Sequence, residues 1–459
     1  MLVLGIFVGV LPGLGGPNGV AILLPLTFTM DPTSAIVMLS CIYWWRAVRR
    51  RHHLNPVQHS RRSLVGRDHL RRLSDGAAGR AAEALTAAFT SSFIGSLVAV
   101  LLITFLAPMI SSFALKFGPP EFFSVYLLTF CSLSASASAA KPSTRQSFLC
   151  RSECCSPAVG MDTVSGQLRM TFGSTDLLRG MNFLVAVIGL FGISEIRTME
   201  ERLALRGHAA GISLRVVLSV WKDLPKYRVT LLRSSFIGCW LGITPGGAIA
   251  ASFMGYNLAK RFSKDPESFG KGRIEGVFAP ETAAHASGTA ALLPMLALGI
   301  PGSGTAAILL GGLMVWGLNP GPLLFVEHKD FVWGLIASMY LGNVVGLVLV
   351  LTTVPIFASI LRVPFAAVAP MIVVSCAIGA YAIQNALFDI WLMLGFGVVG
   401  YVFKKISIPL APFTLALVLG NRAEDAFRLS MIGSGGDMKG FWSNGLVGSI
   451  TTLAIVLLF

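Results

Sequence analysis

Three short segments combine proline with glycine inside otherwise apolar sequence, and these residue types could build a site for an anion. They read LPGLGG at Leu11–Gly16, TPGG at Thr244–Gly247 and LGIPGSGT at Leu298–Thr305. Proline removes a backbone donor and glycine admits conformations closed to other residues, so each segment should interrupt a helix. The helix that begins after such a break presents free N–H groups and the positive end of its dipole, which suit a carboxylate. Broken helices in both halves of a membrane chain predict the substrate site of a transporter.

The candidate substrate-binding residues either unwind the chain or place a small polar group beside an unwound turn. Asn18 could cap the helix after the first break or contact the substrate, and the hydroxyls of Ser303 and Thr305 suit a carboxylate or Na⁺. Helix packing through small residues, and back-bonding of hydroxyls to helix carbonyls, are the alternative roles. The predicted set is Pro12, Gly13, Gly15, Asn18, Pro245, Gly246, Gly247, Pro301, Gly302, Ser303 and Thr305.

Few titratable or metal-binding groups accompany these breaks. Glu281 and His285 could couple a cation to transport, although a packing histidine is an equal alternative. Glu275 would be functional beside an apolar run and merely solvated in a loop. Ser252 and Tyr256 lie about one helical turn apart on one face. The seven cysteines form no CxxC pair and no metal-ligand spacing, so neither a metal nor a disulfide is expected. GxSxG and HExxH motifs are absent, which argues against an intramembrane enzyme.

The elements that must hold these residues are expected to be membrane helices. Apolar residues make up 54% and charged residues 13% of the 459 residues, and the mean hydropathy is +0.73. The sequence therefore predicts an all-α polytopic membrane protein with about ten to twelve transmembrane helices. Apolar runs near or above the length of one span occur at Ser92–Phe117, Met181–Ile193, Phe236–Met254, Phe331–Ile360, Ala366–Ala386, Ile390–Val402 and Gly445–Phe459.

Basic clusters divide the chain and orient it. Residues 1–196 are predicted to form a first membrane half, 197–233 a basic cytoplasmic connection, and 234–459 a second, pseudo-symmetric half. A second basic cluster follows at Lys260–Arg273, and the single apolar span between the two clusters contains TPGG near its middle. Both clusters can be cytoplasmic only if Phe236–Tyr256 is a re-entrant hairpin with Pro245 and Gly246 at its tip. The same geometry is expected at Leu11–Gly16.

Two tracts interrupt the membrane pattern. Arg46–Arg72 holds nine arginines and one acid, which accounts for +8 of the formal net charge of +14. A solvated basic loop and a lipid-binding or nucleic-acid-binding arm are alternatives, but no aromatic residues interleave the charges. We favour a frameshift over residues 46–79, because advancing the frame by one base allows ITSILFNIPGEAWSVATTFDGYPMAQQG. The opposite shift repairs residues 135–159, where an apolar string resembling KALxxAVLSMSLGMLL becomes readable. The chain also opens inside an apolar stretch without a basic leader, which suggests a lost N-terminal segment.

With these motifs in view, the chain resembles the large membrane subunit of the tripartite tricarboxylate transporters, the TctA family. Shared blocks include GVLPGLGGPNGVAILLPLTFTMDPTSAIVML at Gly9–Leu39, DTVSGQLRMTFGS at Asp162–Ser174, and GITPGGAIAASFMGYNLAKRFSKDPESFGKGRIEGVFAPE at Gly242–Glu281. The string LLPMLALGIPGSGTAAILLGGLMVWGLNPGPLLF through Phe325 continues the likeness. The frame-restored NIPGE would be the first-half counterpart of GIPG.

The resemblance implies a secondary transporter in the bacterial inner membrane that imports citrate-like or other carboxylates by symport with Na⁺ or H⁺. It implies a small membrane subunit and a periplasmic solute-binding protein as partners, and neither a cofactor nor nucleic acid. Two departures from the family pattern are the missing first apolar segment and Ala284-His285 in place of an Asn-Asn pair. The alternative is a non-functional product of a frameshifted transporter gene.

Overall fold

The protein is described from a computed structural model that places most of the chain. The predicted frameshifted tract 46–79 and nearly all of 135–159 lie outside the described residues. The described residues are 17–24, 26–27, 30–40, 81–138, 159–162, 166–194, 213–244, 247–269, 272–360, 365–406, 408, 410–442 and 444–458.

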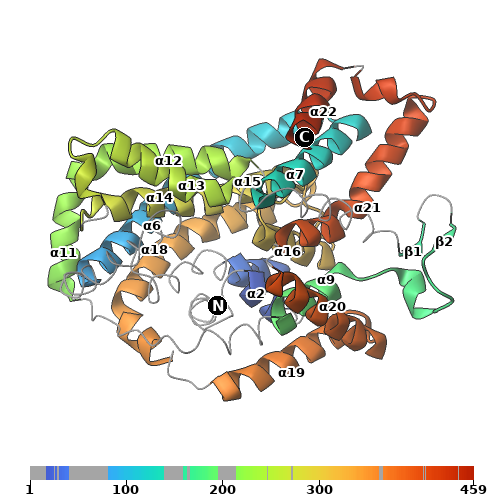
Figure 1. The fold of residues 1–459 in the computed structure, drawn as a ribbon, viewed down its shortest axis with the longest axis horizontal. Coiled ribbons are helices and arrows are strands. Elements are labelled where there is room, and N and C mark those ends of the chain that lie inside the picture. The colour runs from blue at the N-terminus through green and yellow to red at the C-terminus, as the bar shows by residue number, and fades with distance from the viewer. Residues whose placement is uncertain are drawn as a thin grey trace.

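Helices make up almost all of the described structure (Figure 1), which confirms the predicted all-α class. One short antiparallel hairpin pairs β1 (Gly160–Met161) with β2 (Leu168–Arg169), and Gly160 lies opposite Arg169. The helices of the first half are α2 (Pro17–Leu23), α6 (Ala81–Ala114), α7 (Pro119–Ser138), η5 (Asp176–Arg179), α9 (Phe183–Val187) and the π-helix η6 (Ile188–Ile193).

The rest of the chain continues the helical pattern without a strand among its described residues, and its helical residues 214–233 fall in the predicted connection 197–233. Its elements are α11 (Leu214–Asp223), η7 (Leu224–Tyr227), α12 (Arg228–Ile243), α13 (Ala248–Arg261), η8 (Pro266–Ser268), α14 (Glu275–Ala290), α15 (Leu292–Leu298), α16 (Gly304–Val315), α17 (Leu324–Glu327), α18 (Lys329–Ile360), α19 (Phe365–Gln384), α20 (Leu387–Lys405), α21 (Leu410–Gly433), η9 (Met438–Trp442) and α22 (Gly445–Leu458).

Three helices among the described residues are long and apolar enough to cross a membrane. They contain Ala82–Ala114, Lys329–Thr352 and Leu387–Lys405, and four shorter apolar helices accompany them. Their outward faces carry large apolar side chains: Phe105 of α6 is 73% exposed and Trp391 of α20 is 72% exposed. Such exposure suits hydrocarbon as the surrounding solvent, so the chain is a multi-pass membrane protein.

Helix α14 is the centre of one packed group, and small residues let its neighbours approach closely. A Cβ added to Gly95 of α6 would overlap the carbonyl oxygen of Thr282, and one added to Gly238 of α12 would overlap that of Ala283. Helix α13 packs on the same helix, since a Cβ at Gly255 would lie 2.8 Å from the Ala283 Cβ. The close contacts hold α6, α12 and α13 around α14.

A second group lies around η6 and α20, which run parallel to each other. A Cβ at Gly189 would overlap the Met393 carbonyl, and a Cβ at Gly400 would lie 2.8 Å from the Leu190 carbonyl oxygen. Later residues of η6 contact later residues of α20, so the two helices run in the same direction and begin at the same end of the group. That end carries the β1–β2 hairpin, which lies at the right of Figure 1, whereas α11, α12 and α13 lie at the left.

Candidate functional site

The TPGG segment separates two helices that fold back on each other. Helix α12 ends at Ile243, α13 begins at Ala248, and the two helices pack side by side (Figure 1). A Cβ at Gly247 would overlap the Leu241 carbonyl oxygen, so only glycine fits this turn without a shift. The chain thus enters along α12 and returns along α13. Re-entry into the membrane from the cytoplasmic face stays a prediction, as do the roles of Pro245 and Gly246, which lie outside the described residues.

The GIPGSG segment separates α15 from α16. Gly299 ends α15 with φ 71°, a left-handed conformation that glycine adopts readily. Ser303 is the N-cap of α16, and its hydroxyl oxygen accepts a hydrogen bond from the Ala306 N–H at 3.2 Å. Pro301, Gly302 and Thr305 are all buried. The break therefore starts a new helix inside the protein, as its sequence predicts.

These two breaks meet in space although their sequences lie far apart. A Cβ at Gly302 would lie 3.2 Å from the Gly242 carbonyl oxygen and 3.1 Å from the Ala291 Cβ. Gly242 is the second-last residue of α12, directly before the TPGG turn. The structure thus brings Gly247 and Pro301–Thr305 into one neighbourhood.

Helix polarity divides this neighbourhood into two kinds of environment. Helices α12 and α14 run parallel and end together, because a Cβ at Gly242 would overlap the Ser287 carbonyl oxygen and lie 2.9 Å from the Ala290 Cβ. Helices α13 and α16 instead begin at the two breaks. Helix starts carry partial positive charge and helix ends partial negative charge. The neighbourhood therefore contains helix starts, which attract an anion, and the end of α12, which attracts a cation.

Arg422 of α21 is a functional candidate that the sequence interpretation missed. A Cβ at Gly299 would lie 3.4 Å from its Nη1, so the guanidinium reaches the α15–α16 break. It donates to the Pro320 carbonyl at 3.5 Å and to Asn319 Oδ1 at 3.3 Å. No described carboxylate forms an ion pair with it. The sequence contained an indication of this role. Arg422 directly follows the run LALVLGN within one helix, and a charged residue beside an apolar helical run indicates function.

The first break contributes only its following helix. Pro12, Gly13 and Gly15 lie outside the described residues, and Asn18 lies in the first turn of α2, where the structure describes its backbone only. Helix α2 packs against α16, since a Cβ at Gly312 would lie 2.9 Å from Leu24 Cδ1. The helices that follow the first and third breaks are thus neighbours.

Three other sequence candidates lie away from the breaks or serve packing. Glu281 Oε2 and His285 Nε2 are 4.0 Å apart and lie about half a turn around α14 from its α12-facing residues. Glu275 is buried, pairs with Arg273 at 2.6 Å and accepts the Thr230 hydroxyl at 2.6 Å. Its carboxylate is thus neither in a solvated loop nor at a break. Tyr256 packs edge-on against Phe269, with ring centroids 5.7 Å apart.

A second polar region lies where the β1–β2 hairpin meets α21. Buried Asp162 pairs with Arg428 at 2.8 Å and with Arg169 at 3.3 Å, and both arginines also pair with Glu424. A cavity of about 170 Å³ adjoins this ion-pair cluster, and Arg179 and Asn421 also line it. The charges in this cluster compensate one another, which favours a role in holding the hairpin on α21.

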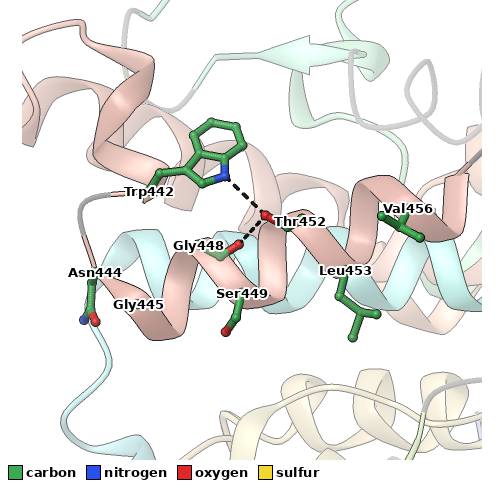
Figure 2. A pocket seen from close by; sticks show the side chains of 8 residues that line it. All are labelled: Trp442, Asn444, Gly445, Gly448, Ser449, Thr452, Leu453 and Val456. Atoms are coloured by element: carbon green, nitrogen blue, oxygen red, sulfur yellow. Dashed lines mark hydrogen bonds between the residues drawn. The ribbon is translucent and has the colours of Figure 1, made fainter.

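A larger depression of about 530 Å³ follows the outer side of α22 (Figure 2). Its floor is a single helix, and the Trp442 indole N–H donates to Thr452 Oγ1 at 3.3 Å while that hydroxyl donates to the Gly448 carbonyl at 2.7 Å. The depression is shallow, mostly apolar and without a charged residue. It lacks the polar groups that a carboxylate site requires.

Comparisons with known proteins agree with this architecture. The family model described as "Tripartite tricarboxylate transporter TctA family" matches residues 1–48 and 76–415. An uncharacterized 52.8 kDa protein in the TAR-I ttuC' 3' region of Agrobacterium vitis is 34% identical over 463 residues, covering 99% of this chain and 90% of that protein. An uncharacterized protein in the TAR-II ttuC' 3' region of the same organism is 37% identical over 220 residues, covering 48% and 91%. No solved structure gave a significant match.

Proposed function

The chain belongs to the tripartite tricarboxylate transporter TctA family, and from this we propose that it carries carboxylates across the inner membrane by symport with a cation. Its role would be that of the large, substrate-translocating membrane subunit. The proposed substrate-binding site is formed by Gly247, Pro301–Thr305 and Arg422.

One observation carries this proposal: two broken segments converge beside an arginine that no described acid neutralises. The start of α16 offers backbone N–H groups to one carboxylate of a di- or tricarboxylate. Arg422 offers a planar fork that can bind a second carboxylate through two hydrogen bonds. A substrate with several carboxylates would thus use both features, whereas a monocarboxylate would use one.

The expected orientation of the chain in the membrane places the end with the β1–β2 hairpin on the side where a periplasmic binding protein would dock. Helices α9 and η6 start at that end, because a Cβ at Gly160 would lie 2.7 Å from the Gly180 Cα just before α9. Parallel α20 starts there as well and ends at Lys404 and Lys405. The positive-inside rule puts those lysines, and the basic connection after η6, in the cytoplasm. We therefore propose that the periplasmic solute-binding protein approaches the hairpin end, while the small membrane subunit contacts the apolar outer helices.

A non-functional gene product is the second candidate, and one observation favours it. The family match skips residues 49–75, which fall inside the predicted frameshifted tract 46–79, although it runs through 135–159. Arginines in place of a membrane segment would cost several kcal/mol each in lipid. Resequencing the genomic DNA across the codons for Trp45–Arg80 and Ala135–Gly160 separates an intact, miscalled frame from a damaged gene.

The function is tested by uptake of labelled citrate and dicarboxylates, with and without a Na⁺ gradient, in cells that also make the two proposed partners. Arg422→Gln is expected to lower citrate uptake at least tenfold. Arg422→Lys should recover little of this, because an ammonium lacks the two-pronged geometry. Arg261→Gln is the matched control, since Arg261 is exposed at the end of α13. Normal uptake by Arg422→Gln would contradict the site, and no uptake of any carboxylate by the wild type would contradict the function.

A further inference from the structure

Three hydroxyls in the packed group around α14 are fully buried and have no hydrogen-bond partner in the part of the chain that the structure describes. They belong to Ser234, Thr282 and Ser287, whose side chains are 0% exposed. Leaving a buried hydroxyl without a partner costs about 1–3 kcal/mol, so each such group in a native structure needs an explanation. A bound ion that the hydroxyl oxygen coordinates would explain such a missing partner.

Neighbouring hydroxyls show that this packing can satisfy a serine without help. Ser235 of α12 donates to the Leu231 carbonyl at 2.9 Å, and Ser92 of α6 donates to the Ala88 carbonyl at 2.6 Å. Both are buried like the unpartnered three. Back-bonding to the carbonyl one turn earlier is the usual solution for helical hydroxyls. Ser287 does not adopt it, which leaves its oxygen available.

Ser287 lies where two helix ends coincide. The C-terminal turns of α12 and α14 meet at Gly242 and Ser287, and the Gly242 carbonyl faces Gly302 across the break. Pro294 has no N–H, so it cannot donate to the Ala290 carbonyl one turn earlier. Helix α14 passes through Ala291, whose backbone angles are helical, directly into α15, so the free negative end at this place is that of α12. A helix end, a carbonyl oxygen and an open hydroxyl are groups that coordinate Na⁺ at broken helices.

We propose that the meeting point of the α12 and α14 C-terminal turns is a binding site for a monovalent cation such as Na⁺, with the Ser287 hydroxyl as a ligand. This inference rests on the proposed function and identifies where the symported ion binds. The other two unpartnered hydroxyls, those of Ser234 and Thr282, lie towards the Arg273–Glu275 end of the same interface. Five residues of helix separate Thr282 from Ser287, about 7.5 Å, so Thr282 is too far from Ser287 to be a further ligand of the same ion.

The Gly242 carbonyl oxygen and the Ser287 hydroxyl suit a cation better than the proposed anion. Carbonyl oxygens repel a carboxylate, and the start of α16, which attracts one, lies across the break. The substrate and the ion would therefore occupy adjacent sides of one neighbourhood. A bound cation at Ser287 would also offset part of the substrate's negative charge, so that each would strengthen the binding of the other.

Cation binding can be measured without transport. The purified full-length chain, free of carboxylate, is heated in NaCl or in choline chloride at equal ionic strength. Na⁺ bound to the folded state should raise the wild-type melting temperature, and the stabilisation should grow as the logarithm of one plus the ratio of Na⁺ concentration to the dissociation constant. Ser287→Cys is the test variant, because it keeps the size of the side chain and replaces a hard oxygen with sulfur. Ser235→Ala is the matched control, a buried hydroxyl of the same interface that already has a partner.

The expected result is stabilisation by Na⁺ in the wild type and in Ser235→Ala, and loss of most of it in Ser287→Cys. Half-maximal stimulation of citrate uptake by Na⁺ should then need at least tenfold more Na⁺ in Ser287→Cys. If Na⁺ and choline act alike on the wild type, or if Ser287→Cys responds like the wild type, the proposal is overturned and a buried water satisfies the hydroxyl. Because the melting experiment uses no substrate, its failure is distinct from absent carboxylate uptake.

Discussion

Two arginines of α21 lie six positions apart and meet opposite surroundings. Arg428 pairs with Asp162 and Glu424 in the cluster under the β1–β2 hairpin, whereas Arg422 reaches the α15–α16 break and finds only neutral oxygens. Arg428 thus pairs with carboxylates of the protein itself. Arg422 has no carboxylate partner among the described residues, so the carboxylate of a substrate can bind to it. Polar groups that the chain itself satisfies indicate structure, and those it leaves open indicate a ligand.

The same contrast holds for the uncharged groups. Most buried hydroxyls around α14 bond to their own helix or to a neighbouring one, as Thr230 does to Glu275, and a few remain open. One of the open hydroxyls, that of Ser287, adjoins the end of α12 at Gly242. The ion-pair cluster, by comparison, binds all four of its charged side chains to one another. The comparison predicts that changes at the breaks will reduce transport more than stability, and changes in the cluster the reverse.

The largest effect on transport is expected from Gly242→Ala. The added methyl group would overlap the Ser287 carbonyl oxygen, so the backbone at the meeting of the two breaks must shift. A displacement of about 1 Å at a binding site can cost about 100-fold, and we expect citrate uptake to fall by that order. Gly395→Ala in α20 is the control, because its Cβ would meet nothing within 4 Å. Equal uptake by the two variants would show that the meeting of the breaks is not the transport site.

The ion-pair cluster is tested by Asp162→Ala, which leaves Arg169 and Arg428 without their shared carboxylate. Both arginines are about one-third exposed, so the loss should be smaller than for a fully buried pair, about 2 kcal/mol in the free energy of unfolding. Denaturation of the purified protein measures it. The exposed Lys226–Asp223 pair is the control, and Asp223→Ala should leave the free energy of unfolding nearly unchanged. A changed KM for citrate in Asp162→Ala would place the cluster in substrate binding instead.

Sequence patterns predicted the helices well because hydropathy and length decide them. The run Phe331–Ile360 lies within α18, Ile390–Val402 within α20, and Met181–Ile193 ends with η6. The helix breaks at TPGG and GIPGSG could also be predicted from the sequence, since proline and glycine act locally on the backbone. The contact between the two breaks at Gly242 and Gly302 could not be predicted, because it depends on tertiary packing between distant segments. Ser287 was missed for the same reason, because only its surroundings show that its hydroxyl lacks a partner. Arg422 could have been noticed in the sequence as a charge directly after an apolar run.

Ser303→Ala is expected to have an intermediate effect, because it removes both an N-cap and a candidate substrate contact. Loss of the bond from the Ala306 N–H should cost about 1 kcal/mol of stability, and citrate uptake should fall several-fold. Ser303→Thr retains a capping hydroxyl and should restore stability. Ser112→Ala is the control, an exposed hydroxyl of α6 that bonds only its own turn. Should Ser303→Ala lower stability and leave uptake intact, the serine caps α16 and does no more.

The smallest effect is expected at Glu281 and His285, the pair proposed from sequence as coupling residues. Their side chains are partly exposed, 4.0 Å apart, and on the side of α14 away from α12 and the open hydroxyl of Ser287. Because the two groups are far apart for an ion pair and lie away from the breaks, Glu281→Gln and His285→Gln should leave the Na⁺ dependence of uptake nearly unchanged. The decisive measurement is the Na⁺ concentration for half-maximal uptake in these two variants beside Ser287→Cys. If this Na⁺ concentration changes in Glu281→Gln and not in Ser287→Cys, the coupling ion binds on the side of α14 that carries Glu281. An unpartnered hydroxyl would then not indicate the ion site, which contradicts the contrast drawn between open and satisfied polar groups.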